Sequence, residues 1–168
     1  DNNAEPTEAL HYAIKNDNKS AVILSLESQA KPDTAFDYAI EKADDKLFEA
    51  VLDKYQGNPT KALQAAIKGN NIKLAQAAIK KGANPDLGIQ AAIAINNPDI
   101  LQLLLDNGAK PNTALKTAVE AGLPKLTKIA LNYKADPSVA IKTAVTQNDT
   151  QISLILLQAG ANPKGLLK

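Results

Sequence analysis

Large apolar side chains recur along the chain in short clusters with a period of 26 residues. The aligned segments read ALHYAI, AFDYAI, ALQAAI, GIQAAI, ALKTAV and AIKTAV, and they begin at Ala9, Ala35, Ala62, Gly88, Ala114 and Ala140. Their second position is always large and apolar, the fifth is always Ala, and the sixth is always Ile or Val. Apolar residues about one turn apart indicate a buried helix face. Each segment is therefore predicted to be a short helix, with Ala where a neighbouring helix comes close.

Prolines mark the same period. Seven of them are separated by 26, 27, 26, 26, 26 and 26 residues: Pro6, Pro32, Pro59, Pro85, Pro111, Pro137 and Pro163. The residues after the first six are Thr7, Asp33, Thr60, Asp86, Asn112 and Ser138. All are N-cap types, whose side-chain oxygen accepts a hydrogen bond from a free N–H of the helix. A helix is therefore predicted to begin at each of them, and the one extra residue is assigned to the loop Glu41, Lys42 and Ala43.

A second helix is predicted in every unit. Residues that tolerate a left-handed backbone follow each first helix, namely Asp17, Asp44, Asn70, Asn96, Gly122 and Asn148, and they predict a sharp turn. Pro98 and Pro124 then suit the first turn of a helix. Apolar residues at helical spacing follow, as in Ile100, Leu103, Leu104 and in Ile152, Ile155, Leu156, and Gly82, Gly108 and Gly160 suit the helix ends.

The fold class expected from this pattern is all-α, an α-solenoid of six stacked helix–turn–helix repeats. The repeats span residues 7–32, 33–59, 60–85, 86–111, 112–137 and 138–163 and form a single repeat domain over 1–168. Stacked repeats bury a continuous core between neighbours. The first residues, DNNAEP, match Asp106–Pro111, and Lys164–Leu167 would open a seventh first helix. We therefore expect a monomeric piece of a longer array or larger protein.

Two segments resemble the signatures of ankyrin repeats. LHYA at Leu10–Ala13 is similar to LHxA, and LLLDNGAKPN at Leu103–Asn112 is similar to LLLxxGADxN. An ankyrin unit has about 33 residues with a β-turn segment, whereas this unit has 26 and lacks the hairpin residues. The resemblance implies stacked helix pairs and partner binding on the concave surface of the inner helices. Another α-solenoid of short helix pairs is the alternative fold.

Composition removes most catalytic possibilities. Cys is absent and His11 is the one histidine, so neither a zinc site of Cys and His ligands nor a cofactor is expected. His11 occupies the LHxA position and is interpreted as structural, because no nucleophile motif accompanies it. Asp44 and Asp45 are interpreted as a solvated loop pair rather than a metal site. No phosphate-binding glycine loop is present, and we expect a protein that is not an enzyme.

Charge and aromatic content bear on partners. Residues 1–59 carry twelve acids and six lysines, and residues 60–168 carry six acids and thirteen lysines. Without Arg, and with only 4% aromatic residues, this is a poor pattern for nucleic-acid binding. No apolar run approaches the ~18 residues that cross a bilayer, so membrane insertion is not expected. The cellular location is not defined by the sequence.

One position of the first helix is the candidate contact site. Tyr12 and Tyr38 follow the His11 position in the first two repeats, either as partner anchors, a role for which Tyr is suited, or as packing between repeats. Beside them runs a row with one side chain per repeat: Asp37, Gln64, Gln90, Lys116 and Lys142. The predicted function is a non-enzymatic scaffold that binds a protein partner there. The alternatives are a targeting or regulatory part of a larger enzyme, and an inhibitor that covers an enzyme's active site.

Overall fold

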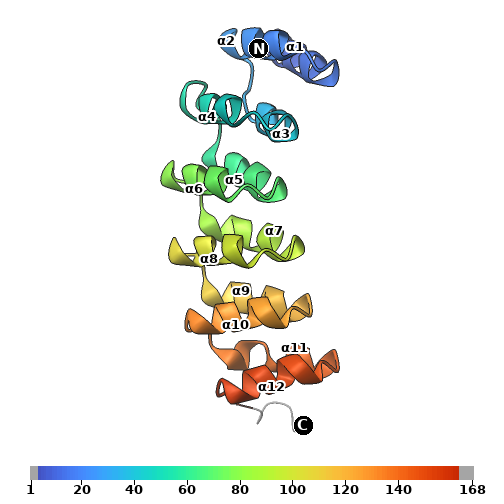
Figure 1. Cartoon of the computed structure of the whole chain (residues 1–168), viewed down its shortest axis with the longest axis vertical. Coiled ribbons are helices and arrows are strands. Elements are labelled where there is room, and N and C mark those ends of the chain that lie inside the picture. The colour runs from blue at the N-terminus through green and yellow to red at the C-terminus, as the bar shows by residue number, and fades with distance from the viewer. Residues whose placement is uncertain (1–3, 163–168) are drawn as a thin grey trace. The chain divides into compact units, whose positions relative to one another are not determined.

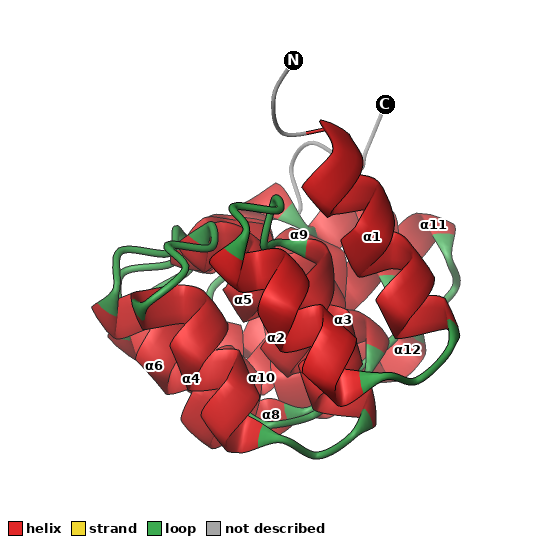
Figure 2. Ribbon diagram, turned by 90° about the horizontal axis from the view of Figure 1, so that it is seen from above, coloured by secondary structure: helices red, strands yellow, loops and turns green. Residues whose placement is uncertain are grey.

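All regular structure that the computed structural model describes is helical. The model describes residues 4–162, and these contain twelve α-helices and two short 3-10 turns (Figure 2). The chain divides into two compact units, Asp1–Asn84 and Pro85–Lys168. The helix predicted after Pro163 lies outside the described residues. The fold is thus all-α, as expected.

Each unit contains three helix pairs that follow one another along the chain (Figure 1). The first unit has α1 (Ala4–Lys15), α2 (Lys19–Glu27), α3 (Thr34–Glu41), α4 (Asp45–Asp53), α5 (Pro59–Lys68) and α6 (Ile72–Lys80). The second has η1 (Pro85–Gly88), α7 (Ile89–Ala94), α8 (Pro98–Asp106), α9 (Pro111–Glu120), α10 (Pro124–Asn132), η2 (Pro137–Val139), α11 (Ile141–Thr146) and α12 (Thr150–Gln158). Helices pack within a pair, and each pair packs on the next within its unit. This order is consistent with a helical repeat.

The turn inside every pair has three residues, and its middle residue is left-handed. These residues are Asp17, Ala43, Asn70, Asn96, Gly122 and Asn148, with φ between 49° and 66°. Five of these six residues were predicted, but the prediction that Asp44 is the left-handed residue of the second turn was wrong. Asp44 has φ −99° and instead caps α4, where its side chain accepts from the Leu47 N–H at 3.0 Å. Asp44 is the last residue of its turn, and the residues at that position in four other pairs, Asn18, Asn71, Asn97 and Asp149, cap the second helix in the same way.

The alanine at the fifth position of each segment is buried in all six repeats. Its carbonyl also accepts a hydrogen bond from the last residue of the turn, for example from Asn18 to Ala13 at 2.9 Å and from Asn97 to Ala92 at 3.1 Å. A carbonyl at the helix end would otherwise lack a partner. The prediction of a packing role for this alanine is confirmed.

The residues predicted as N-caps have a different role. Except for Asp33, they lie inside a helix or a 3-10 turn, and Asp33 makes no side-chain cap bond. Their side-chain oxygens instead accept a hydrogen bond from a backbone N–H at the end of the same repeat, 24 or 25 residues later. The six bonds are Lys31 to Thr7, Asn58 to Asp33, Asn84 to Thr60, Lys110 to Asp86, Asp136 to Asn112 and Asn162 to Ser138, over 2.7–3.5 Å. The residue type is thus set by a bond that joins the start of a repeat to its end.

The extra residue of the second repeat lies at the end of α4 rather than in the loop at Glu41–Ala43. Each repeat has one left-handed residue in its turn and another after its second helix. These two residues are 13 positions apart in the second repeat, at Ala43 and Gln56, but 12 apart in the third, at Asn70 and Gly82. Tyr55 N–H donates to the Ala50 carbonyl, and Gly57 N–H donates to the Val51 carbonyl, so the helix end is widened by one residue. The turn between α3 and α4 therefore keeps the standard length.

The core includes the second-position side chains, all of which are buried: Leu10, Phe36, Leu63, Ile89, Leu115 and Ile141. Burial of each such side chain stabilises the fold by about 1.5–3 kcal/mol. Among the sixth-position residues, Ile67, Ile93 and Val119 are buried as predicted, whereas Val145 is exposed. This position faces the following repeat, as Ile40 does when it lies against Gly69. Val145 belongs to the last described pair.

Candidate functional site

A row of polar side chains lies on the first helices of successive repeats. In the first unit it contains Asp37 on α3 and Gln64 on α5, and in the second unit Gln90, Lys116 and Lys142 on α7, α9 and α11; all five are exposed. Each directly follows a buried core residue, and one residue corresponds to about 100° around a helix. Burial of the preceding residue in the core therefore directs each of these five side chains to the surface. We call these five residues the first-helix row.

In the first unit the row borders a shallow hollow of about 200 Å³ between α3 and α5. Asp33, Asp37 and Gln64 line it together with Lys61 and Lys68. The Lys68 ammonium lies 3.9 Å from the Asp37 carboxylate, and both side chains are mostly exposed. An exposed pair of this kind contributes little to stability. Its charges therefore remain available to a partner's polar groups.

Tyr38 is not part of an exposed surface. Its side chain is only 4% exposed, and its hydroxyl donates a hydrogen bond to Asp17 Oδ1 at 3.1 Å. Lys42 Nζ lies 5.8 Å from the centre of the ring and 2.9 Å from Asp17. Burial and the bond to the Asp17 carboxylate raise the pKa of Tyr38. Tyr38 thus joins the second repeat to the turn of the first.

Asp17 is held in its charged form by the same cluster. The hydrogen bond from Lys42 is the largest cause that lowers the pKa of Asp17, and the Tyr38 hydroxyl adds to it. The carboxylate in turn raises the pKa of Lys42. The sequence contains the signal for this cluster, because Asp17 is the one carboxylate at the middle position of a turn.

Tyr12 lies in the equivalent position of the first repeat and is 72% exposed. Of the two alternatives for these tyrosines, packing between repeats applies to Tyr38, but the two rings do not lie in the same environment. The difference follows from position, because Tyr38 packs against the preceding turn. The structure therefore leaves Tyr12 as the accessible ring of the two.

The residues considered above for catalysis or metal binding are exposed or bonded to other side chains. His11 is exposed on α1. Asp44 caps α4 and pairs with Lys19 at 2.5 Å, and Asp45 accepts a hydrogen bond from Asn71 at 3.3 Å. Within residues 4–162 no group of three or more His, Cys, Asp or Glu side chains is placed to hold a metal ion. No helix in that range is long and apolar enough to cross a bilayer.

Comparison with models of known protein families found no match. A comparison with curated proteins found no similar sequence. The class of protein that the fold defines is therefore an all-helical protein with paired helices, consistent with a helical repeat.

Proposed function

We propose that this chain is an ankyrin-like array without hairpin fingers and that it acts as a non-enzymatic scaffold that binds a protein partner. Support for the ankyrin-like class comes from the LLLDNGAKPN segment. Leu104 and Leu105 are buried in α8, Gly108 is left-handed at φ 90°, and Ala109 is buried behind it. Short helix pairs joined by tight turns agree with this class.

The observation that carries the binding proposal is the first-helix row. Every member is exposed while the residue before it is fixed in the core, so the part of the row within each unit is a preformed surface on rigid elements. A preformed surface loses little conformational entropy when it binds. Asp37 in the first unit suits a basic group of a partner, and Lys116 and Lys142 in the second unit suit acidic groups.

The experiment is affinity capture from extracts of the source organism, with wild type and charge-reversed variants on separate resins. Lys116→Glu/Lys142→Glu changes the row, and Lys125→Glu/Lys128→Glu makes the same charge change at exposed residues of α10. We expect a partner that wild type and the α10 variant retain and the row variant loses, by about tenfold or more for two contacts of about 1 kcal/mol each. Equal capture by all three would place binding elsewhere.

Direct binding of the captured partner tests the first unit in the same way. Asp37→Lys changes the row beside the hollow, and Asp53→Lys, on an exposed part of α4, is the matched control. Charge contacts predict that the affinity falls as salt increases. An affinity that is unchanged in Asp37→Lys and insensitive to salt would contradict a role for the row's charges.

A further inference from the structure

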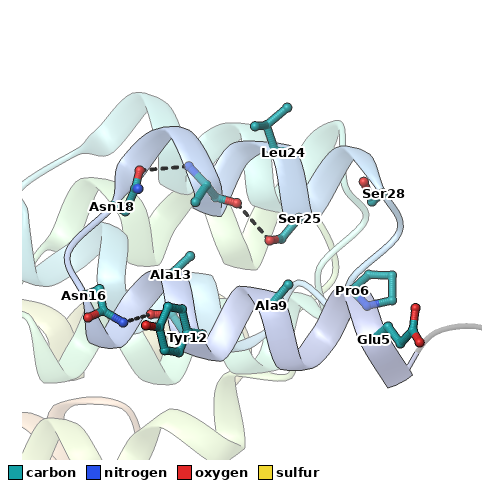
Figure 3. A pocket seen from close by; sticks show the side chains of 11 residues that line it. Glu5, Pro6, Ala9, Tyr12, Ala13, Asn16, Asn18, Leu24, Ser25 and Ser28 are labelled. Carbon is teal, nitrogen blue, oxygen red and sulfur yellow. Dashed lines mark hydrogen bonds between the residues drawn. The ribbon is translucent and has the colours of Figure 1, made fainter.

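A hollow of about 260 Å³ lies between the second helices of the first two repeats, α2 and α4. Its apolar lining consists of Leu47, which is buried, and of Ile23 and Ala50, which are half-buried. It shares no residue with the hollow beside Tyr12 and Leu24 (Figure 3), which is lined by the first helix pair alone. The hollow between α2 and α4 is therefore bounded by two described repeats, and its shape depends on described helices only.

Two residues of this hollow depart from the pattern of the repeats. Ile23 stands where four of the other five repeats have an exposed polar side chain: Glu49, Gln76, Gln102 and Lys128. Ala50 is small where four of the other five repeats have a large apolar side chain: Leu24, Leu103, Ile129 and Ile155. An added apolar side chain beside a missing one leaves an apolar hollow that is open to solvent. Such a hollow suits an apolar side chain that comes from outside the molecule.

The widened end of α4, where the extra residue of the second repeat lies, extends this hollow. Tyr55 lines it and also lines a second hollow of about 620 Å³ between the loops that follow α2 and α4. Lys54 Nζ donates to the Tyr55 hydroxyl at 3.2 Å and lies 4.9 Å from the centre of the ring, which stabilises the position of the ring. Both hollows include Lys54 and Tyr55, so they meet there. We call the two hollows together the α2–α4 groove.

The charges along the α2–α4 groove leave a surplus of ammonium groups. The acids that line it each pair with a lysine: Asp44 with Lys19 at 2.5 Å and Glu27 with Lys54 at 3.3 Å. Within residues 4–162 no ion pair includes Lys46, which lines the first hollow, or Lys31, which lines the second. Lys110, the counterpart of Lys31, pairs with Asp86, whose counterpart in the first repeat is Thr7. Lys31 and Lys46 therefore suit carboxylates of a partner.

We propose that the α2–α4 groove binds an extended segment of a partner protein in which acidic residues flank a bulky apolar side chain. The apolar side chain enters the hollow beside Ile23 and Ala50 and contacts the Tyr55 ring. Carboxylates on either side of it approach Lys46 and Lys31. Burial of the apolar side chain supplies affinity, and the two lysines select acidic segments. The groove lies on second helices, so this surface is separate from the first-helix row.

The test is an NMR titration of the full chain, labelled at its isoleucine methyl groups, with a synthetic peptide whose two ends are capped. The probe is Glu-Asp-Glu-Leu-Glu-Asp-Glu; one control peptide has Ala in place of Leu, and the other has Lys in place of every acid. The methyl shifts of Ile23 report on the hollow. We expect saturable shifts with the probe, binding about tenfold weaker for the Ala peptide because one buried side chain is lost, and no binding of the Lys peptide.

Two variants of the chain test the two properties of the groove. Ala50→Leu fills the hollow with a side chain that other repeats have at this position, and Lys46→Glu reverses one charge at its edge. Ala77→Leu and Lys73→Glu, at the same positions of α6, are the matched controls. Each groove variant is expected to weaken binding of the probe by about fivefold or more, and the controls are expected to bind it like wild type. Circular dichroism verifies that all four variants fold.

Three outcomes overturn the proposal. The first is that wild type shows no saturable shift up to about 10 mM probe, a range that detects weak binding. The second is that the Leu and Ala peptides bind equally well, because the attraction is then one of charge alone, as for any polyanion. The third is that Ala50→Leu and Lys46→Glu both bind the probe as tightly as their α6 controls, which places the peptide on another surface.

Discussion

Gly57 lies so close to Phe36 that a Cβ added to Gly57 would be 2.6 Å from Cζ of the phenyl ring. Gly57 follows the left-handed residue after α4, where the other repeats have a buried alanine: Ala30, Ala83, Ala109, Ala135 and Ala161. Phe36 in turn stands where the other repeats have Leu or Ile, and it packs on Phe48 with 4.9 Å between ring centres. The larger ring thus occupies the space of the missing methyl group.

This pair predicts a coupled effect on stability. Gly57→Ala is expected to lower the free energy of unfolding by about 1–3 kcal/mol, because the methyl group overpacks the core. In the Phe36→Leu background the same change is expected to cost at least about 0.5 kcal/mol less. Urea titrations of the two single variants, the double variant and wild type measure the coupling. Additive effects would contradict the pairing.

The hydrogen bonds that join the start of a repeat to its end predict where a single substitution acts. Asn112→Ala removes the acceptor of the Asp136 N–H, 24 residues away. The hydrogen exchange of that amide is expected to become faster, and stability is expected to fall by about 0.5–1.5 kcal/mol. Asn112→Asp keeps an acceptor oxygen and is the control. Faster exchange at the N-terminal amides of α9 with no change at Asp136 would favour an N-cap role instead.

The left-handed glycine after α8 predicts a purely backbone effect. Gly108 has φ 90°, and a Cβ there would contact nothing within 4 Å. Gly108→Ala is therefore expected to cost about 1 kcal/mol, from the left-handed conformation alone. Gly108→Asn is expected to cost less, since Asn tolerates this conformation. Chemical denaturation measures both, and equal stability of all three proteins would contradict the explanation.

Asp44 predicts a pH dependence of stability. The hydrogen bond from Lys19 is the largest cause that lowers the pKa of Asp44, and the Leu47 N–H adds to it. A carboxyl whose pKa is lower in the folded state contributes stability above its unfolded pKa of about 3.9 and loses it as the pH falls through the folded pKa. Wild type is therefore expected to lose this contribution as the pH falls below about 5.

Asp44→Asn separates the charge from the cap. Asn accepts the Leu47 N–H equally well, but it does not titrate and does not pair with Lys19. The variant is expected to be less stable than wild type near pH 7, with a smaller difference near pH 2. Thermal melts across this range measure the difference. A stability gap that stays constant with pH would show that the charge of Asp44 contributes nothing.

The sequence by itself determined the helix pairs and their order. Core positions such as Leu63 and turn residues such as Asn70 and Gly108 were readable because they depend on local rules, namely helical periodicity and tolerance of a left-handed backbone. The exposure of Gln64 and Lys116 follows from the same rules, since each adjoins a core residue.

Only the tertiary structure decided the contacts between residues that are far apart in the chain. Asn112 is of a residue type preferred at N-caps, but its partner is the Asp136 N–H at the end of the same repeat, which no local rule identifies. The extra residue near Tyr55, the burial of Tyr38 and the exposure of Tyr12 depend in the same way on which surface lies opposite. Equivalent positions in a repeat sequence have the same local conformation, but their burial is set by the neighbour that packs on them.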